Sequence, residues 1–119
     1  MAGYCTVAQV KLAYNTNEID DLGDDDANGS ADTGVIEDAI YRASRAIWSA
    51  IAPRYYSVTT MNPESYSTGA YPVLDSMTAT LAADYMRERQ GGEPVANDHP
   101  ALTWARRVAL GVERIMAAS

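Results

Sequence analysis

Residues 34–52 read Gly-Val-Ile-Glu-Asp-Ala-Ile-Tyr-Arg-Ala-Ser-Arg-Ala-Ile-Trp-Ser-Ala-Ile-Ala, and this stretch decides the fold. Its apolar residues recur at helical spacing: Ile36, Ile40, Ala43, Ile47, and then Ala50 or Ile51. Glu37 and Asp38 fall in the first turn, where negative charge complements the helix dipole. Pro53 follows and disfavours helical angles at the residue before it. The pattern therefore predicts an amphipathic helix over residues 34–52 that buries its isoleucine face.

One further helix is predicted on each side of this one in the chain. Before it, Thr6 and Gln9 fit a capping box, so a short helix is expected to begin at Thr6 and to end before residues 15–17. After it, an apolar stripe begins beyond Pro72 and stops at a glycine pair, which is a common end of a helix. The stripe consists of Leu74, Met77, Leu81 and Tyr85, and the glycine pair is Gly91-Gly92.

A last helix is predicted near the C-terminus. Asp98 is the expected cap, and Pro100 falls in the first turn, where a missing N–H costs nothing. The stripe runs through Ala101, Ala105, Val108, Val112 and Ile115. Together the patterns predict one all-α domain over residues 1–119, a small antiparallel bundle of about four helices. Ile40, Ile47, Val108 and Ile115 are expected to share its core.

Two connections are long. Residues 53–72 show no helical period, and Tyr55, Tyr56 and Val58 favour extended backbone, so a long irregular loop with a short hairpin is expected there. The other connection lies in an acidic stretch, residues 18–38, which carries nine acidic side chains and no basic one. The whole chain has net charge -7, so its remainder is nearly neutral.

The acidic stretch contains Asp24-x-Asp26-x-Asn28-Gly29, the opening of a calcium loop. Continued at the same spacing, the ligand positions fall on Asp24, Asp26, Asn28, the Ser30 carbonyl and Asp32. The twelfth position, where a calcium loop has a bidentate Glu, is Val35, so Glu37 or Asp38 would have to substitute for it. The alternatives are a calcium site and a solvated acidic turn in which Asn28-Gly29 supplies positive φ angles.

Composition excludes several classes. A pI near 4.4 argues against a DNA-binding groove, which needs clustered Lys and Arg. Cys5 is the only cysteine, so the chain has no internal disulfide, and no Cys–His metal or catalytic set is present. No apolar run approaches the ~20 residues of a membrane span, and no signal peptide is recognisable. A soluble cytosolic protein is expected.

Catalysis is the least supported class of function. The single histidine, His99, stands beside a predicted helix cap, and no Ser or Cys has an evident base partner. Asp84 and Glu88 lie four apart on one helix without a histidine, which does not make a di-metal motif. No cofactor other than calcium is suggested, and the chain is not expected to be an enzyme.

Tyrosine and arginine side chains are the candidate contacts with other chains. Arg54 and Tyr55 end the helix and open the long loop, where they would either meet a partner or cover the helix end and the edge of the core. Exposed aromatic and arginine residues are frequent in interfaces. The predicted interface set is Arg54, Tyr55, Tyr56, Tyr66, Tyr71 and Trp104, with Trp104 on the outer face of the last helix beside Leu110.

The order of these elements resembles a known family. A short capped helix, the Asp24-x-Asp26-x-Asn28-Gly29 loop and the isoleucine helix closing on Arg54-Tyr55 come first. A helix with Leu74, Leu81-Ala82 and Tyr85-x-x-x-Arg89 follows, and an amphipathic helix ends the chain. This layout is similar to the Mu-like phage head–tail adaptor (head-completion, connector) family, from which the chain departs by a longer segment at residues 57–71.

The resemblance implies a structural protein of the virion neck, made in the host cytoplasm. Such subunits assemble with themselves into a ring of about twelve copies below the portal protein. The ring extends the DNA channel and docks a stopper or tail-completion protein. DNA passes through without specific binding, which suits an acidic chain that repels phosphates. No membrane is involved.

Two other functions stay open from the sequence. One is a small calcium-dependent helical binding module, which would be monomeric and would bind calcium measurably. The other is a helical chaperone or regulatory subunit that forms no ring. Ring-sized particles, or recruitment only in the presence of a portal, would distinguish the adaptor from both.

Overall fold

The protein is all-helical in the part of the chain that the structure, a computed structural model, describes, namely residues 3–13 and 33–115. Its helices are α1 (Val7–Ala13), α3 (Thr33–Tyr55), α4 (Pro72–Arg89) and α5 (Pro100–Ala109), and a short 3₁₀ turn, η1 (Thr59–Met61), lies between α3 and α4. These residues contain no strand. The predicted small antiparallel helical bundle is confirmed.

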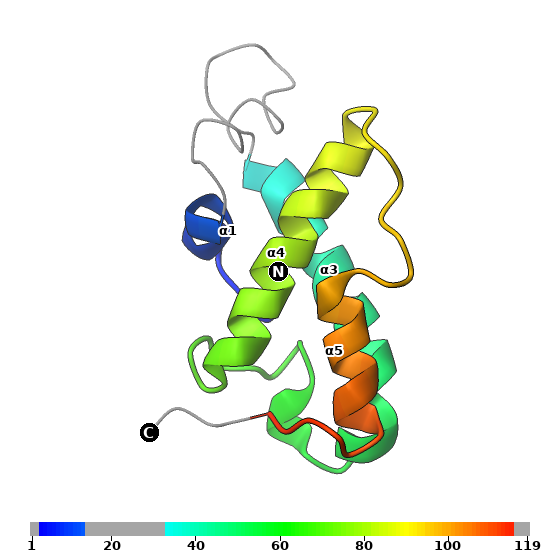
Figure 1. The fold of residues 1–119 in the computed structure, drawn as a ribbon. Coiled ribbons are helices and arrows are strands. Elements are labelled where there is room, and N and C mark those ends of the chain that lie inside the picture. The colour runs from blue at the N-terminus through cyan, green and yellow to red at the C-terminus, as the bar shows by residue number, and fades with distance from the viewer. Residues whose placement is uncertain (1–2, 14–32, 116–119) are drawn as a thin grey trace.

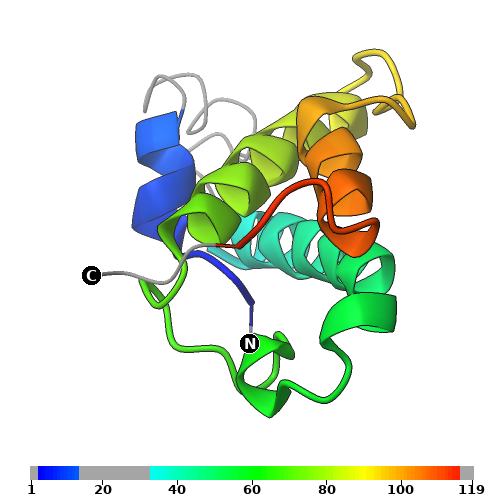
Figure 2. The ribbon, with the colours of Figure 1, turned by 60° about the horizontal axis from the view of Figure 1, so that its bottom comes forward.

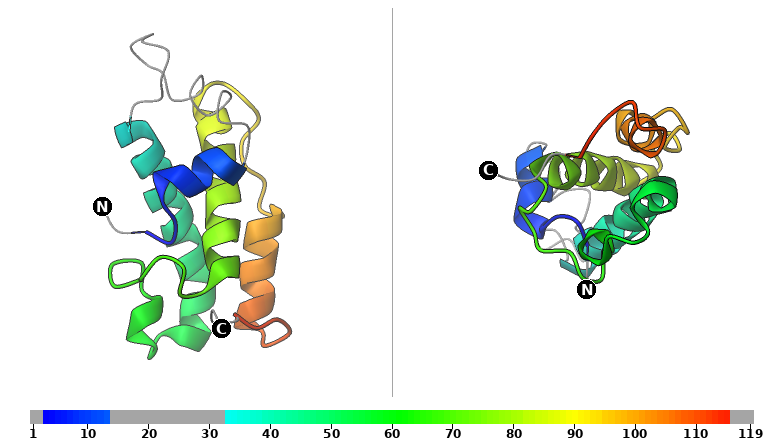
Figure 3. Two further views of the ribbon diagram at one scale, coloured as in Figure 1. Left: turned by 90° about the vertical axis from the view of Figure 1, so that its left-hand side faces the viewer. Right: turned by 90° about the horizontal axis from the view of Figure 1, so that it is seen from below.

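The three longer helices lie side by side and alternate in direction (Figure 1). α3 runs from the top of this view to the bottom, α4 returns to the top, and α5 runs down again. α1 lies across α3 and α4 rather than along them (Figure 3). A view from another side shows the turns between α3 and α4 folded back under the bundle (Figure 2). The C-terminal ends of α3 and α5 therefore share one end of the molecule.

The core lies where α3, α4 and α5 meet. Ile47 on α3 and Val108 on α5 are fully buried, and Ile40 is 6% exposed, so the predicted helical phase of both elements is confirmed. Ile115, also expected in the core, is only half-buried, although it packs against the core. The largest fully buried side chains are Tyr4, Val10, Ile36, Ile47, Ile51, Met61, Leu74, Thr78, Leu81, Met86 and Val108.

The capping box at the N-terminus is confirmed. The Gln9 backbone N–H donates to Thr6 Oγ1 at 3.2 Å, and the Thr6 N–H donates to Gln9 Oε1 at 2.8 Å. Two donors that the first turn of α1 would leave unpaired are thereby satisfied reciprocally.

α3 is longer than predicted. It ends at Tyr55 rather than at Ala52, with Pro53 inside its last turn. A proline there removes one backbone N–H from the helical ladder but does not reverse the chain. Ile51 is fully buried and Tyr55 packs against the core, so tertiary contacts hold the turn in helical form on both sides of Pro53.

The extended segment and hairpin expected in residues 53–72 are absent from the structure. The connection consists of η1 and hydrogen-bonded turns, in which Ser65 N–H donates to Asn62 O and Ala70 N–H donates to Ser67 O. Met61 is 2% exposed, so its side chain anchors the connection to the core, although most residues of the connection are exposed. Of the residues that suggested a strand, Tyr55 ends α3 and packs against the core, whereas Tyr56 and Val58 are exposed; none lies in a strand, because β-propensity depends strongly on context.

α5 differs from its prediction at both ends. His99, not Asp98, is the N-cap, and its Nδ1 accepts a hydrogen bond from the Ala101 N–H at 3.1 Å. The helix stops at Ala109, and Gly111 follows at φ 80°, a left-handed conformation that favours glycine. The predicted stripe is therefore interrupted, and Val112 is 65% exposed.

Replacing Ile47 by alanine should lower the free energy of unfolding by roughly 2–5 kcal/mol, because transfer energy is lost and a cavity is left. Urea denaturation followed by far-UV circular dichroism measures this change. Ser49→Ala, an exposed position on the same helix, is the control and should stay within about 0.5 kcal/mol of the wild type. An equally small effect at Ile47 would contradict the described core.

Candidate assembly surface

The predicted interface residues are spread over three different environments. Trp104 is only 8% exposed and lies in the core, so its expected place on the outer face of the last helix is wrong. Tyr55, Tyr66 and Tyr71 are half-buried and pack against the core. Arg54 and Tyr56 are exposed. Whether any of them contacts a partner chain stays a prediction.

Tyr66 and Tyr71 belong to a junction centred on the buried carboxylate of Asp75, which is 4% exposed. The Tyr66 hydroxyl donates to Asp75 Oδ1. The Gly69 N–H donates to Asp75 Oδ2 at 2.8 Å, and Gln9 Nε2 donates to the same oxygen at 3.0 Å. One side chain of α4 therefore joins α1 and the connection between α3 and α4.

Tyrosine rings extend this junction. Tyr4 meets the Tyr66 ring edge-to-face with centroids 5.0 Å apart, and its hydroxyl donates to the Met61 carbonyl at 2.6 Å. The Tyr71 N–H donates to the Tyr66 hydroxyl oxygen at 3.0 Å. Burial first, and then the hydrogen bond to Asp75, raise the pKa of Tyr66 above its ordinary value, so its proton stays available for donation.

Sequence reasoning did not single out Asp75. The available signal was weak: one aspartate directly after Leu74 in the first turn of a predicted helix, where acidic residues are common for electrostatic reasons alone. Gln9 and Asp75 also line a surface hollow of about 560 Å³ between α1 and α4, with the exposed Leu12 at its edge.

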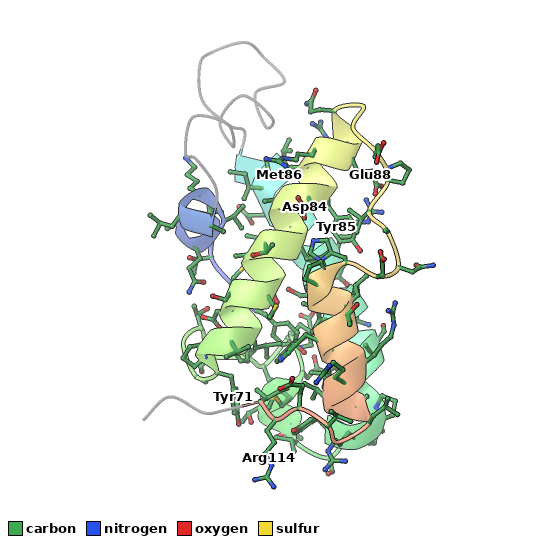
Figure 4. The ribbon with its side chains drawn as sticks, in the orientation of Figure 1. Tyr71, Asp84, Tyr85, Met86, Glu88 and Arg114 are labelled. Carbon is green, nitrogen blue, oxygen red and sulfur yellow. The ribbon has the colours of Figure 1, made fainter. Side chains whose placement is uncertain are left out.

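A second feature is an exposed surface where α3 and α5 end, which we call the arginine end. It consists of Arg54, Tyr56, Arg106, Arg107, Leu110, Val112 and Arg114. Tyr56 is 81% exposed and Leu110 is 78% exposed. Arg114 points away from the body of the molecule at this end (Figure 4). Large apolar side chains in water, surrounded by guanidinium groups, are typical of a surface that meets another chain.

The Arg54 side chain lies close to Gly111, so the ends of α3 and α5 meet here. A Cβ placed on Gly111 would lie 2.9 Å from one guanidinium nitrogen of Arg54, so the glycine leaves the space that this side chain fills. Beside them, Arg107 forms an ion pair with Glu113 at 3.2 Å. The exposed residues that follow the ends of α3 and α5, namely Tyr56, Leu110 and Val112, are therefore brought to one end of the molecule from segments far apart in the sequence.

The opposite end of the bundle carries a different cluster. Arg42 lies over the ring of Tyr85, 3.9 Å from its centroid, and donates to Glu88 Oε1 at 3.0 Å. The Val95 N–H donates to Glu88 Oε2 at 2.7 Å. Figure 4 shows Tyr85 and Glu88 on the upper part of α4. The Val95 bond first, and then Arg42, hold the pKa of Glu88 below its ordinary value.

His99 joins helices, whereas the sequence suggested only an incidental position at a helix start. Its Nδ1 caps α5, and its Nε2 lies 2.5 Å from Asp84 Oδ2 on α4. Because Nδ1 accepts a hydrogen bond, the proton that the ring shares with Asp84 is on Nε2. Both ring nitrogens are thus engaged in holding α5 to α4.

The predicted calcium ligands, Asp24, Asp26, Asn28, Ser30 and Asp32, all lie outside the described residues, and calcium binding stays a prediction. Within residues 3–13 and 33–115, no group of three or more His, Cys, Asp or Glu side chains is placed to hold a metal ion. None of the helices described is long and apolar enough to cross a membrane.

Comparison with known proteins identifies the class: this is a Mu-like phage protein. The family model described as Bacteriophage Mu, Gp36 matches residues 4–116. Since the match spans most of the chain, the chain belongs to that family. No curated protein and no solved structure shows a significant match. The resemblance to a Mu-like phage family is confirmed, and the family suggests a role in phage structure or morphogenesis.

Replacing Asp75 by alanine should lower the free energy of unfolding by roughly 2–5 kcal/mol, because three partly buried donors lose their acceptor. Asp75→Asn should cost less, about 1–2 kcal/mol, because the amide oxygen still accepts from Gln9 and Gly69. Urea denaturation compares both with Ser76→Ala, an exposed neighbour. If Asp75→Ala and this control had the same free energy of unfolding, the hydrogen bonds of the junction would contribute nothing to stability.

Replacing Glu88 by glutamine should lower the melting temperature at pH 7 and leave it unchanged in acid. A carboxylate whose pKa is depressed by folding stabilises the protein above its unfolded pKa, about 4.3, and the effect disappears as the pH falls through the folded pKa. Thermal denaturation from pH 7 to pH 3 measures the difference from the wild type. Glu93→Gln, exposed in the following segment, is the control. A difference that persists undiminished at pH 3 would contradict the charge-assisted role of Glu88.

Proposed function

We propose that this chain is a head–tail adaptor of a phage neck. In this proposal, copies form a ring below the portal protein, extend the DNA channel and dock a stopper or tail-completion protein. The match of residues 4–116 to the phage Mu Gp36 family carries the proposal. The order of the helices, which suggested the adaptor role, agrees with it.

The arginine end supports assembly with other chains. Tyr56, Leu110 and Val112 each expose more than half of their side chains at one end of the bundle. Isolated apolar residues on a surface are ordinary, but a group of them surrounded by arginines is what a subunit would bury against a neighbour. We place the contact with the next subunit, or with the portal, on this surface.

The proposed role is structural and not enzymatic. His99 uses both ring nitrogens to connect α5 with α4, which leaves neither available as a base. Burial raises the pKa of Cys5 to about 12, so its thiol stays protonated near neutral pH and is a poor nucleophile. Net charge -7 also suits a conduit through which DNA slides, because like charges keep the phosphates from binding tightly.

Leu110→Asp should leave the fold intact and prevent the protein from joining heads to tails. A carboxylate at the centre of the arginine end would have to be desolvated in any apolar contact. Electron microscopy of particles assembled with the variant, and co-sedimentation with portal-containing heads, measure the effect. Circular dichroism verifies the fold.

Leu12→Asp makes the same change at a leucine that is 81% exposed on α1, away from the arginine end, and should permit normal assembly. If the Leu110→Asp variant still joins heads to tails normally, the arginine end is not the surface through which the adaptor binds its neighbours. If the wild-type protein never associates with portal-containing heads, the adaptor function itself is wrong.

A further inference from the structure

Charge is distributed unevenly along this chain. Four of its nine basic residues belong to the arginine end: Arg54, Arg106, Arg107 and Arg114. Within the segment that contains three of them, Glu113 is the only acidic residue, and it pairs with Arg107. Arg54, Arg106 and Arg114 are exposed beside apolar side chains, so this end is basic in a protein that is acidic as a whole.

The acidic stretch has the complementary composition. It carries nine acidic residues and no basic one, and it includes two large apolar residues, Ile19 and Leu22, among them. Aspartate and glutamate oxygens can accept hydrogen bonds from guanidinium groups, often two at a time. Ile19 and Leu22 are large apolar residues, as are Leu110 and Val112 of the arginine end.

The described part of the acidic stretch, residues 33–38, and the arginine end lie at opposite ends of α3. The acidic stretch leads into the N-terminal end of α3, and Arg54 lies in the last turn of the same helix. A helix of 23 residues spans about 34 Å. Figure 1 shows the N-terminal end of α3 at the top and its C-terminal end at the bottom. Such an arrangement favours contact between different copies over closure within one.

We propose that the arginine end of each copy binds the acidic stretch of a second copy. The inference rests on the proposed adaptor function and specifies which two surfaces join neighbouring subunits. Each copy offers two different faces, so the contact is heterologous and repeats from subunit to subunit, as a ring requires. Tyr56, Leu110 and Val112 are the apolar residues that this contact would cover.

The contact is expected to be weak for a single pair and sensitive to salt. Exposed ion pairs contribute little each, and added salt screens them. Each contact would combine several ion pairs with a few apolar residues. In a closed ring this contact is repeated at every subunit, so the ring can be stable although two isolated subunits associate weakly. Reversing the charge of exposed residues therefore tests the contact directly, because it changes the electrostatic attraction between subunits without altering a core residue.

Two charge-reversal variants of the full chain test the proposal. The first is Arg106→Glu with Arg114→Glu, and the second is Asp24→Lys with Asp26→Lys. Sedimentation velocity over a concentration series at low and high salt gives the dissociation constant for self-association. Each variant alone should raise that constant at least about tenfold, and an equimolar mixture of the two should restore most of the affinity.

Control substitutions alter charge elsewhere. Arg45→Glu changes an exposed arginine in the middle of α3, and Glu93→Lys with Asp98→Lys changes two exposed acids between α4 and α5. Both controls should self-associate within about threefold of the wild type, a difference below 1 kcal/mol. Circular dichroism confirms that every variant is folded before its association is compared.

The remaining outcomes overturn the inference. If the wild type self-associates and both reversals leave this unchanged, the faces are wrong while the adaptor function stands. A wild type that stays monomeric at low salt, or an acidic stretch that is bound within the same copy, also rules the contact out. Binding of a short DNA duplex that is lost only in the arginine variant, with self-association unaffected, would assign the arginine end to phosphate instead. The adaptor function is judged separately, by association with portal-containing heads.

Discussion

The hydrogen bonds to the buried carboxylate of Asp75 are the interaction on which the arrangement of α1, α4 and the connection between α3 and α4 depends. Asp75 stands in the first turn of α4 and accepts hydrogen bonds from α1, from a backbone amide and from a tyrosine of the connection between α3 and α4. A buried charge is costly unless it is fully hydrogen-bonded, so each donor must stay in place. Parts of the chain separated by more than sixty residues are therefore fixed by one side chain.

The same interaction explains why the connection between α3 and α4 is ordered although it lacks regular structure. Met61 and Tyr66 enter from it into the space beside Tyr4, and the Tyr4 hydroxyl bonds to the Met61 carbonyl. The connection is thus anchored to the core of the bundle through Met61 and Tyr66. The exposed apolar side chains Tyr56, Leu110 and Val112 lie instead near the ends of α3 and α5, where Arg54 approaches Gly111.

The helices were predictable because periodicity reports burial directly. Ile40, Ile47 and Val108 are buried as their spacing indicated, and the capping box of α1 formed from two residues three apart. The features that the sequence did not predict depend on contacts with residues that are distant in the sequence. Only tertiary packing carries α3 past Pro53, and only the proximity of Asp84 explains why His99, rather than Asp98, begins α5. For the same reason Trp104 and Tyr66 could be recognised as aromatic but not as inward-facing.

The position of the single cysteine limits how copies of this chain can be joined. Cys5 is 7% exposed and lies among core residues, so its sulfur cannot reach a second copy while the fold is intact. A disulfide between subunits would require the sulfur atoms to approach within about 2 Å. Contacts between folded copies of this chain consequently do not include a Cys5 disulfide, so Cys5 does not make them sensitive to the redox state of the compartment in which they form.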